Sequence, residues 1–391
     1  MLFRRTFLIF CTSFSLSAFA GLTPESAAAD SSLRVALGKL IFEDKNLSSP
    51  AGQSCASCHQ SENFFADPGQ VVSAGANARL FGNRNAPSIS YVKFNPDLFW
   101  NKEESLWMGG FFHDGRAKTL QEQAGGPFLN PLEMGNKTMA EVVAKVKSSD
   151  YKVILEQLYG ADIWQNSDAA FNAITAAIVA YEQGPEFATF SSKYDYYLQG
   201  KVQLTAQEKL GLELFEAEDK GNCAACHPSQ VSAENPQPLF TDYSYDNLGQ
   251  PANKNLAFYR MNDLFNPQGL AYIDNGLANN PHIDNAHEEK GKFKVATLRN
   301  IAKTAPYLHN GLFDNLKEVV DFYNERDLDS KKSLTEQRWA QAEVQENVND
   351  EELGDLKLTP EEVDALVAFM ETLTDGYSLP ILADQNQRLH P

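Results

Sequence analysis

Apolar residues recur every three or four positions in four stretches of the chain, which predicts four amphipathic helices. In the first pair of helices the apolar positions are Leu33, Leu37, Leu40 and Ile41, and Leu210, Leu214 and Phe215. In the second pair they are Phe171, Ile174, Ile178 and Tyr181, and Val363, Leu366, Phe369 and Met370. We expect each of these stripes to face a hydrophobic core.

Polar residues mark the beginnings of several helices. Thr205 is followed by Glu208 at the capping-box spacing, and Thr138, which is followed by Glu141, opens the first of two helices expected between residues 138 and 160. The last apolar stripe is preceded by Thr359-Pro360, and proline is favoured at the first helical position. Residues 228–292 are rich in Asn, Pro and Gly without clear periodicity, so we expect loops there.

The chain contains an internal repeat. Residues 37–43 read LGKLIFE and residues 210–216 read LGLELFE, and each segment leads into a Cys-x-x-Cys-His pentapeptide. These pentapeptides are Cys55-Ala56-Ser57-Cys58-His59 and Cys223-Ala224-Ala225-Cys226-His227. The repeat predicts two tandem domains, residues 21–200 and 201–391, divided near Gln199-Gly200.

The pentapeptide is typical of covalent haem attachment. Two thiols one helical turn apart can reach the two vinyl groups of a porphyrin, and the adjacent histidine can then ligate the iron. A zinc site would need four converging ligands, and a thiol redox pair has no use for the histidine. We therefore expect a mainly α fold of two cytochrome c-like domains, each with one c-type haem, and His59 and His227 as iron ligands.

The amino terminus resembles a secretory signal. Arg4 and Arg5 precede an apolar run over residues 7–19, and Ala18-Phe19-Ala20 offers a small-residue cleavage site. An uncleaved membrane anchor is the alternative, although the run is short for a span. Removal of residues 1–20 also removes Cys11, which leaves only the four motif cysteines. Because bacteria attach haem covalently outside the cytoplasm, we predict a periplasmic protein.

The charge balance is strongly acidic. The chain has 33 basic and 52 acidic residues, a net charge of -19, and loss of Arg4 and Arg5 makes it 31 minus 52, or -21. This balance argues against nucleic acid and favours a basic partner such as a small cationic electron carrier. Charge that serves only solubility is an equally good explanation.

The residue opposite the proximal histidine decides whether a haem carries electrons or binds a small molecule. Between His59 and Met108 the chain has no further histidine or methionine. The first haem therefore lacks a nearby strong sixth ligand in the sequence. An open iron would be a site for peroxide or oxygen.

With these features the chain resembles the bacterial dihaem cytochrome c peroxidase family, which includes the MauG proteins. The resemblance covers nearly all of the chain after residue 20. In the first half it rests on Phe65-Ala66-Asp67, Arg84-Asn85-Ala86-Pro87-Ser88, Asp114-Gly115-Arg116, Gln123, Pro127 and Glu133-Met134. In the second half it rests on Phe293-Lys294, Leu298-Arg299-Asn300, Thr304-Ala305-Pro306-Tyr307 and Phe322-Tyr323.

The resemblance implies roles for individual residues. Gln123, Pro127 and Glu133 would line the open face of the peroxidatic haem, with Glu133 as the acid-base group; otherwise Glu133 is a surface carboxylate. Tyr323 would be the axial ligand of the second iron, as in the MauG group, where the peroxidases have methionine. Otherwise Tyr323 is a core aromatic residue.

A calcium ion between the two haems is also implied by the resemblance. Its protein ligands would be Asn85, Thr304 and Pro306, through the oxygen atoms that a hard cation prefers. Without the family, Thr304-Ala305-Pro306 would be only a turn.

The sequence departs from the family in two places. No histidine follows the first haem motif at the place where peroxidases that need reductive activation carry one, so we expect the first haem to be ready without activation. His113 stands where the family usually has a tryptophan between the haems. Trp100 and Trp107 are near in sequence, and either could substitute.

The predicted function is a dihaem peroxidase that reduces hydrogen peroxide with electrons from a cytochrome c or cupredoxin. One alternative is a MauG-like oxidase that modifies tryptophan or tyrosine residues of a partner protein. A second alternative is a non-enzymatic dihaem electron carrier, in which both irons would be six-coordinate.

Overall fold

The computed structural model describes residues 24–231, 237–284 and 286–380, and the predicted signal at residues 1–20 lies outside them. The fold is mainly helical, as predicted. Within the described ranges, no helix is long and apolar enough to cross a membrane.

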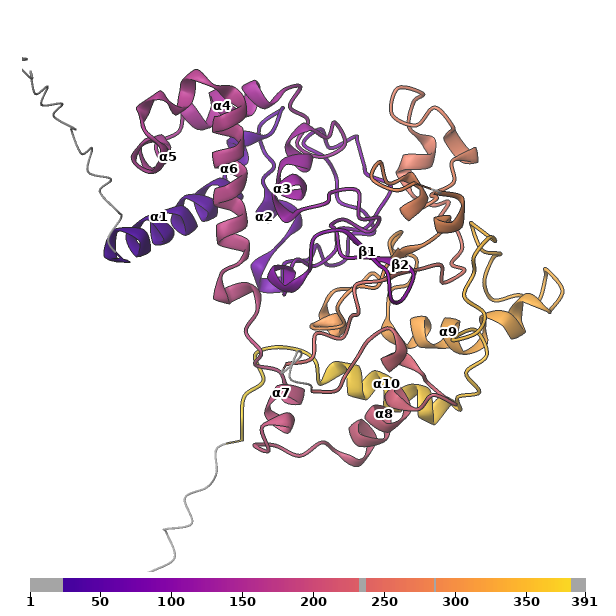
Figure 1. The fold of residues 1–391 in the computed structure, drawn as a ribbon. Helices are drawn as coiled ribbons and strands as arrows, with labels where there is room; N and C mark the ends of the chain where they lie inside the picture. Colours follow the sequence, from indigo (N-terminus) through magenta and orange to yellow (C-terminus); the bar gives the residue numbers. More distant parts are fainter. Residues whose placement is uncertain (1–23, 232–236, 285, 381–391) are drawn as a thin grey trace, which may run out of the picture.

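The helices before residue 185 gather in one part of the molecule (Figure 1). The long helix α1 (Pro24–Glu43) packs against α6 (Ser167–Glu182), and α3 (Leu120–Leu129) and α4 (Met139–Lys147) also contact α6. Helix α5 (Lys152–Tyr159) packs on α1. The capping threonine expected before α4 is present, because Thr138 accepts a hydrogen bond from the Glu141 amide.

The remaining helices form a second group (Figure 1). Here α8 (Ala206–Glu216) packs against α10 (Pro360–Glu371), which also contacts α9 (Leu316–Ser330). The capping box predicted at Thr205 is formed, and α10 begins with Pro360 as predicted, behind a capping box of Thr359 with Glu362. The short helix α7 (Lys193–Leu198) ends just before the predicted domain boundary at Gln199-Gly200.

The internal repeat encodes the same helix crossing twice. Gly38 of α1 lies so close to α6 that an added Cβ would collide with the carbonyl oxygen of Ala177. Gly211 of α8 lies in the same way against the carbonyl oxygen of Ala365 in α10. A glycine in each repeat therefore lets two helix backbones touch, which gives each group of helices its own core.

The predicted apolar stripes are confirmed for the closing helices, whose eight positions are all buried. The prediction is wrong for Leu40 and Leu210, which are each 41% exposed. Helices α1 and α8 each bury a narrower stripe than the sequence suggests, because the close contact at Gly38 and Gly211 leaves those two leucines beside the crossing.

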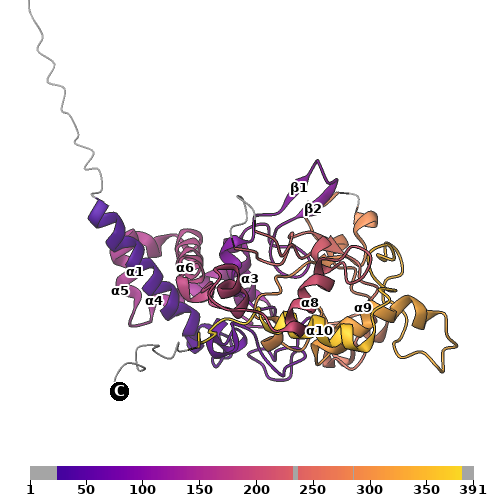
Figure 2. The same ribbon diagram turned by 90° about the horizontal axis from the view of Figure 1, so that it is seen from below.

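Strands are few and short. Strands β1 (Phe99–Asn101) and β2 (Leu106–Met108) pair antiparallel as a hairpin that projects from the body of the molecule (Figure 2). Strands β3 (Tyr245–Asp246) and β4 (Phe293–Lys294) form a second antiparallel pair. Most of the described chain between residues 228 and 292 consists of loops and single 3-10 turns, as the sequence predicts.

A buried ion-pair cluster joins the two groups of helices. Arg84 pairs with Asp114 at 2.7 Å and with Asp274 at 2.7 Å, and the ring of His309 stacks on Phe293 beside them. The carboxylates belong to different halves of the sequence, 160 positions apart by number. Arg84 therefore ties the halves together next to the first haem motif.

Candidate functional site

Each cysteine pair occupies one helical turn. The first pair lies in α2 (Cys55–Cys58), where the amide of His59 donates to the carbonyl of Cys55 at 2.9 Å. The second pair repeats this arrangement, since the amide of His227 donates to the carbonyl of Cys223 at 2.9 Å. All four described cysteines are free thiols.

Both motif histidines are oriented by a backbone carbonyl. His59 Nδ1 lies 3.1 Å from the carbonyl oxygen of Phe65, and His227 Nδ1 lies 2.7 Å from that of Phe240. Phe65 and Phe240 both have left-handed backbones, with φ of 56° and 54°. A hydrogen bond at Nδ1 leaves Nε2 as the ligand atom.

Burial supports the same assignment for both imidazoles. It lowers the pKa of His59, and it lowers that of His227 to about 4. Each ring is therefore neutral at physiological pH, which is the form that binds a metal.

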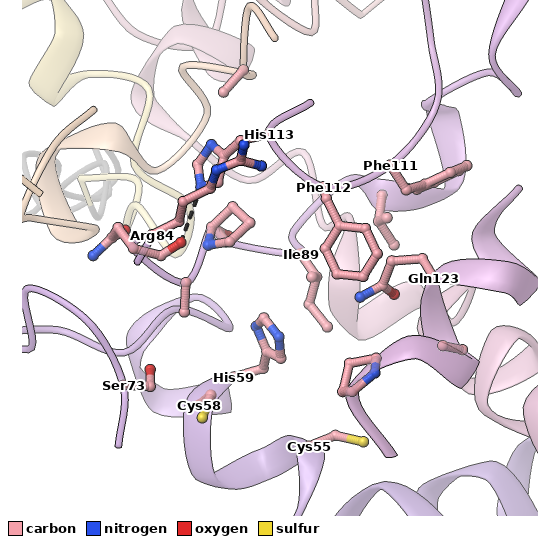
Figure 3. Close-up of a pocket in the computed structure, with 18 of the residues that line it drawn as sticks. Cys55, Cys58, His59, Ser73, Arg84, Ile89, Phe111, Phe112, His113 and Gln123 are labelled. Carbon is pink, nitrogen blue, oxygen red and sulfur yellow. Dashed lines mark hydrogen bonds between the residues drawn. The ribbon is translucent and has the colours of Figure 1, made fainter. Parts of the chain in front are cut away.

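A cavity of about 280 Å³ surrounds the first motif. Its walls include Cys55, Cys58 and His59 together with Gln123, Pro127 and Glu133, so the structure brings all six predicted residues to one site. Figure 3 shows His59 projecting into the cavity, with Gln123 and Phe112 across from it and the two cysteines at its lower end.

Helix α3 supplies the wall across from His59. Gln123 and Pro127 are four residues apart and so share one face of the helix. Pro127 lies inside the helix, where its ring removes the hydrogen bond that would otherwise go to the carbonyl of Gln123. The helix ends at Leu129, and the chain turns back at Asn130 to place Glu133 at the cavity.

Asn130 holds the Glu133 carboxyl in place. Its side-chain amide donates to Glu133 Oε1 at 2.9 Å, and its carbonyl accepts from the Glu133 amide at 3.0 Å. Burial raises the pKa of Glu133, while Arg116 and the Asn130 hydrogen bond lower it by less. Glu133 is therefore a positioned cavity residue rather than a surface carboxylate.

Tyr323 lies near the second motif. It comes from α9 and packs at the edge of the core that includes Phe322, whereas Phe322 itself is fully buried. Burial raises the pKa of Tyr323, and the nearby Cys223 and Cys226 raise it further. No hydrogen bond links its hydroxyl to another described residue. The site thus places a phenol beside the second cysteine pair.

The three residues expected at calcium lie on neighbouring loops. The amide of Asn85 donates to the carbonyl of His309 at 2.7 Å, and the Asn85 side-chain nitrogen donates to the Val71 carbonyl at 3.1 Å. The carbonyl of Ala305, between Thr304 and Pro306, accepts from the amide of Gly69 at 3.4 Å. The Asn85 loop and the 304–306 loop therefore both contact residues 69–71.

His113 also lines the first cavity, at the end near Arg84. Its Nε2 lies 3.0 Å from the carbonyl oxygen of Asn85, and burial together with Arg84 lowers its pKa to about 4. Neither Trp100 nor Trp107 is part of the cavity wall. Trp100 is 42% exposed on the β1–β2 hairpin, so it does not take the place of the missing tryptophan.

The residues present suit haem better than zinc. In the described chain, the one group of three residues whose ligand atoms could meet at a metal is Cys226, Asp246 and Glu352, at the second motif. It includes neither Cys223 nor His227, so neither pentapeptide forms a zinc site. Free thiols one turn apart, a neutral histidine and an adjoining cavity fit a covalent haem at the first motif.

Four charged residues in the cavity wall, Arg84, Arg116, Glu182 and Lys294, were not singled out as site residues from the sequence. Lys294 and Arg116 belong to family motifs, but nothing local shows that they face the cavity. Glu182 follows the apolar stripe of α6 and is only 4% exposed, and burial raises its pKa to about 8. The sequence did contain one indication that Glu182 is buried, because it directly follows Tyr181, the last residue of the apolar stripe.

Comparisons with known proteins agree with this site. Residues 32–203 match the family model described as di-haem cytochrome c peroxidase. The methylamine utilization protein MauG of Paracoccus denitrificans is 36% identical over 93% of this chain and 94% of its own length. Cytochrome c551 peroxidase of Nitrosomonas europaea is 28% identical over 93% of this chain and 86% of its own.

A solved structure shows a similar fold. The diheme peroxidase BthA of Burkholderia thailandensis superposes with a TM-score of 0.77 and 33% identity, over 88% of this chain and 86% of that one. The motifs, the cavity and these similarities lead to one conclusion. The chain belongs to the di-haem cytochrome c peroxidase family, a family of haem-dependent oxidoreductases that includes MauG.

Proposed function

We propose that the protein is a periplasmic peroxidase that reduces hydrogen peroxide to water with electrons from a small redox protein. The observation that carries this proposal is that Glu133 lines the same cavity as Cys55, Cys58 and His59. The periplasmic location rests on the amino-terminal signal predicted from the sequence.

The reaction consumes two protons and two electrons for each peroxide and yields two water molecules. The haem held by Cys55, Cys58 and His59 supplies the redox chemistry of its iron. Glu133 takes a proton from one peroxide oxygen and returns it to the other, because its raised pKa suits it to both steps. Gln123 orients peroxide through its side-chain amide, and Pro127 narrows the space beside it.

The second haem, held by Cys223, Cys226 and His227, is the proposed entry point for electrons. Tyr323 would be a further ligand of its iron, and its position near both cysteines supports this role. The two sites correspond to the proposed domains, residues 21–200 and 201–391. A cytochrome c or cupredoxin with a basic surface would suit the net charge of -19.

Calcium is the proposed ion at Asn85, Thr304 and Pro306. Support comes from the placement of these residues on adjoining loops between the two halves. Such an ion would stabilise the junction at which Arg84 already pairs with Asp274.

A second candidate is a MauG-like oxidase that removes electrons from tyrosine or tryptophan residues of a partner protein. The observation that favours it is Tyr323 beside the second cysteine pair, since a phenolate ligand lowers a haem potential. A non-enzymatic electron carrier, the third possibility, would show no peroxide turnover.

Turnover of peroxide with reduced cytochrome c tests the proposal. We expect Glu133→Gln to lower kcat about 10²- to 10⁴-fold, as for loss of a general acid-base, with unchanged haem content. The exposed Glu104 offers a matched control, and Glu104→Gln should keep full activity. Full activity of Glu133→Gln would refute the role of Glu133, and a wild-type protein that is oxidised by peroxide but does not turn over would favour the oxidase.

A further inference from the structure

Lys294 is a basic residue in the wall of the first cavity, and it has no counter-ion among the described residues. Its Nζ donates to Asn95 Oδ1 at 3.0 Å and to the carbonyl of Gly110, both of which are neutral acceptors. No carboxylate in the described ranges forms an ion pair with it. Burial lowers the pKa of Lys294 to about 7, and the more distant Asp114 offsets this effect only in part.

The other charges at this end of the cavity balance one another. Arg84 pairs with Asp114 and Asp274, and Arg116 pairs with Asp114 at 2.8 Å, so two cations meet two anions. His113 and His309 are neutral, because burial lowers their pKa values to about 4 and about 3. Lys294 is therefore the one basic group of this cluster that has no carboxylate partner among the described residues.

The two glutamates of the cavity do not neutralise Lys294. Glu133 is hydrogen-bonded to Asn130, and Glu182 lies close enough to Cys55 to raise the pKa of that thiol. Because burial raises the pKa of Glu182 to about 8, its carboxyl is mostly uncharged at neutral pH. A buried, unpaired ammonium is costly and loses its proton readily, so an anion beside Lys294 is what would keep it fully charged in the loaded protein.

The end of the cavity at which Lys294 lies indicates which anion it would meet. A haem carries its two vinyl groups and its two propionate carboxylates on opposite edges of the porphyrin. Cys55 and Cys58, which would bind the vinyl edge, lie at the lower end of the cavity, whereas Phe111 and His113 lie toward the other end (Figure 3). Lys294 lies at that other end, since its Nζ bonds to Gly110 and its amide donates to the His113 carbonyl at 2.9 Å.

We propose that Lys294 binds the propionate carboxylates of the first haem. A haem attached to the first half of the chain is thereby held by an ammonium from the second half. Strand β4, which carries Lys294, pairs with β3, and Asp246 of β3 lies beside Cys226 of the other motif. The β3–β4 pair thus connects Lys294 at the first haem site with the edge of the second.

This assignment rests on haem attachment at Cys55 and Cys58 and is independent of the reaction proposed above. Its test uses the holoprotein with Lys294→Met and measures the midpoint potentials of both haems and the propionate bending band in the resonance Raman spectrum. Loss of a positive charge beside the first haem destabilises its reduced state. We expect that potential to fall and the band to shift, with the second haem unchanged.

Two further variants complete the test. Lys294→Arg should restore the potential, and Lys290→Met, which breaks only an outer ion pair with Glu346 at 3.3 Å, should leave both potentials unchanged. If Lys294→Met yields no holoprotein, Lys294→Gln removes the charge and keeps a donor for Asn95 or Gly110. An unchanged potential and Raman band in a charge-removing variant would overturn the proposal, even if the protein became less stable.

Discussion

The ion-pair cluster at the junction makes a quantitative prediction for Asp274→Ala. Asp274 is 3% exposed, and it accepts hydrogen bonds from Arg84 Nε at 2.8 Å, Arg84 Nη2 at 2.7 Å and Asn83 Nδ2 at 3.2 Å. Removal of one partner from a buried ion pair costs about 3–5 kcal/mol. Arg84 keeps Asp114 at 2.7 Å, so we expect the lower end, about 3 kcal/mol, or roughly a 100-fold larger unfolding constant.

Urea unfolding of the holoprotein, followed by circular dichroism, measures this loss. The exposed Asp263 provides a control, and Asp263→Ala should change the free energy of unfolding by less than about 0.5 kcal/mol. The double variant Arg84→Met/Asp274→Ala should lose less than the sum of the single variants. A loss below about 1 kcal/mol for Asp274→Ala, or additive losses in the double variant, would refute the idea that this cluster holds the halves together.

The same cluster predicts how stability depends on pH. Burial would raise the pKa of Asp274, but the charge of Arg84 and its hydrogen bonds outweigh that effect and lower the pKa. Arg84 and Arg116 likewise lower the pKa of Asp114 against the effect of burial. The two carboxylates therefore make their full contribution to the free energy of unfolding above about pH 3.9, the pKa of an aspartate in the unfolded chain. This contribution is lost as the pH falls below that value. In the Asp274→Ala variant, the free energy of unfolding should depend less on pH in this acidic range.

Two further predictions concern the proposed ligands. Tyr323→Phe should change the ferric absorption spectrum of the second haem and leave the first unchanged; an unaltered spectrum would remove Tyr323 from the axial position. Chelation of calcium should lower the melting temperature of the holoprotein, and Asn85→Ala should abolish that difference, whereas equal melting with and without chelator in the wild type would argue against the ion.

Local patterns in the sequence were sufficient to predict many of the helices. Thr138, Thr205 and the Thr359-Pro360 pair predicted three helix starts, because a cap is a short-range hydrogen bond and proline favours the first helical position. The repeated Leu-Gly before each motif predicted equivalent helices. It did not show that Gly38 and Gly211 sit at the crossings, since a crossing depends on a partner more than a hundred residues away.

Other elements gave no local signal. Helix α3 contains two glycines and Pro127, which weaken the helical pattern, yet it forms because it packs on α6 and its N-terminus is capped by Thr119. Arg84 and Asp274 are 190 positions apart, so no periodicity links them. The cavity residues Gln123, Pro127 and Glu133 were identified by family resemblance rather than by pattern, and Lys294 joined them only in the folded chain.

The ferric electron paramagnetic resonance spectrum of the resting holoprotein tests the central claim most directly. The iron at His59, next to Glu133, would be open, and the iron at His227 would have a further protein ligand. We therefore expect one high-spin and one low-spin haem, with the high-spin signal lost on addition of hydrogen peroxide. Two low-spin haems that do not respond to peroxide would contradict this claim.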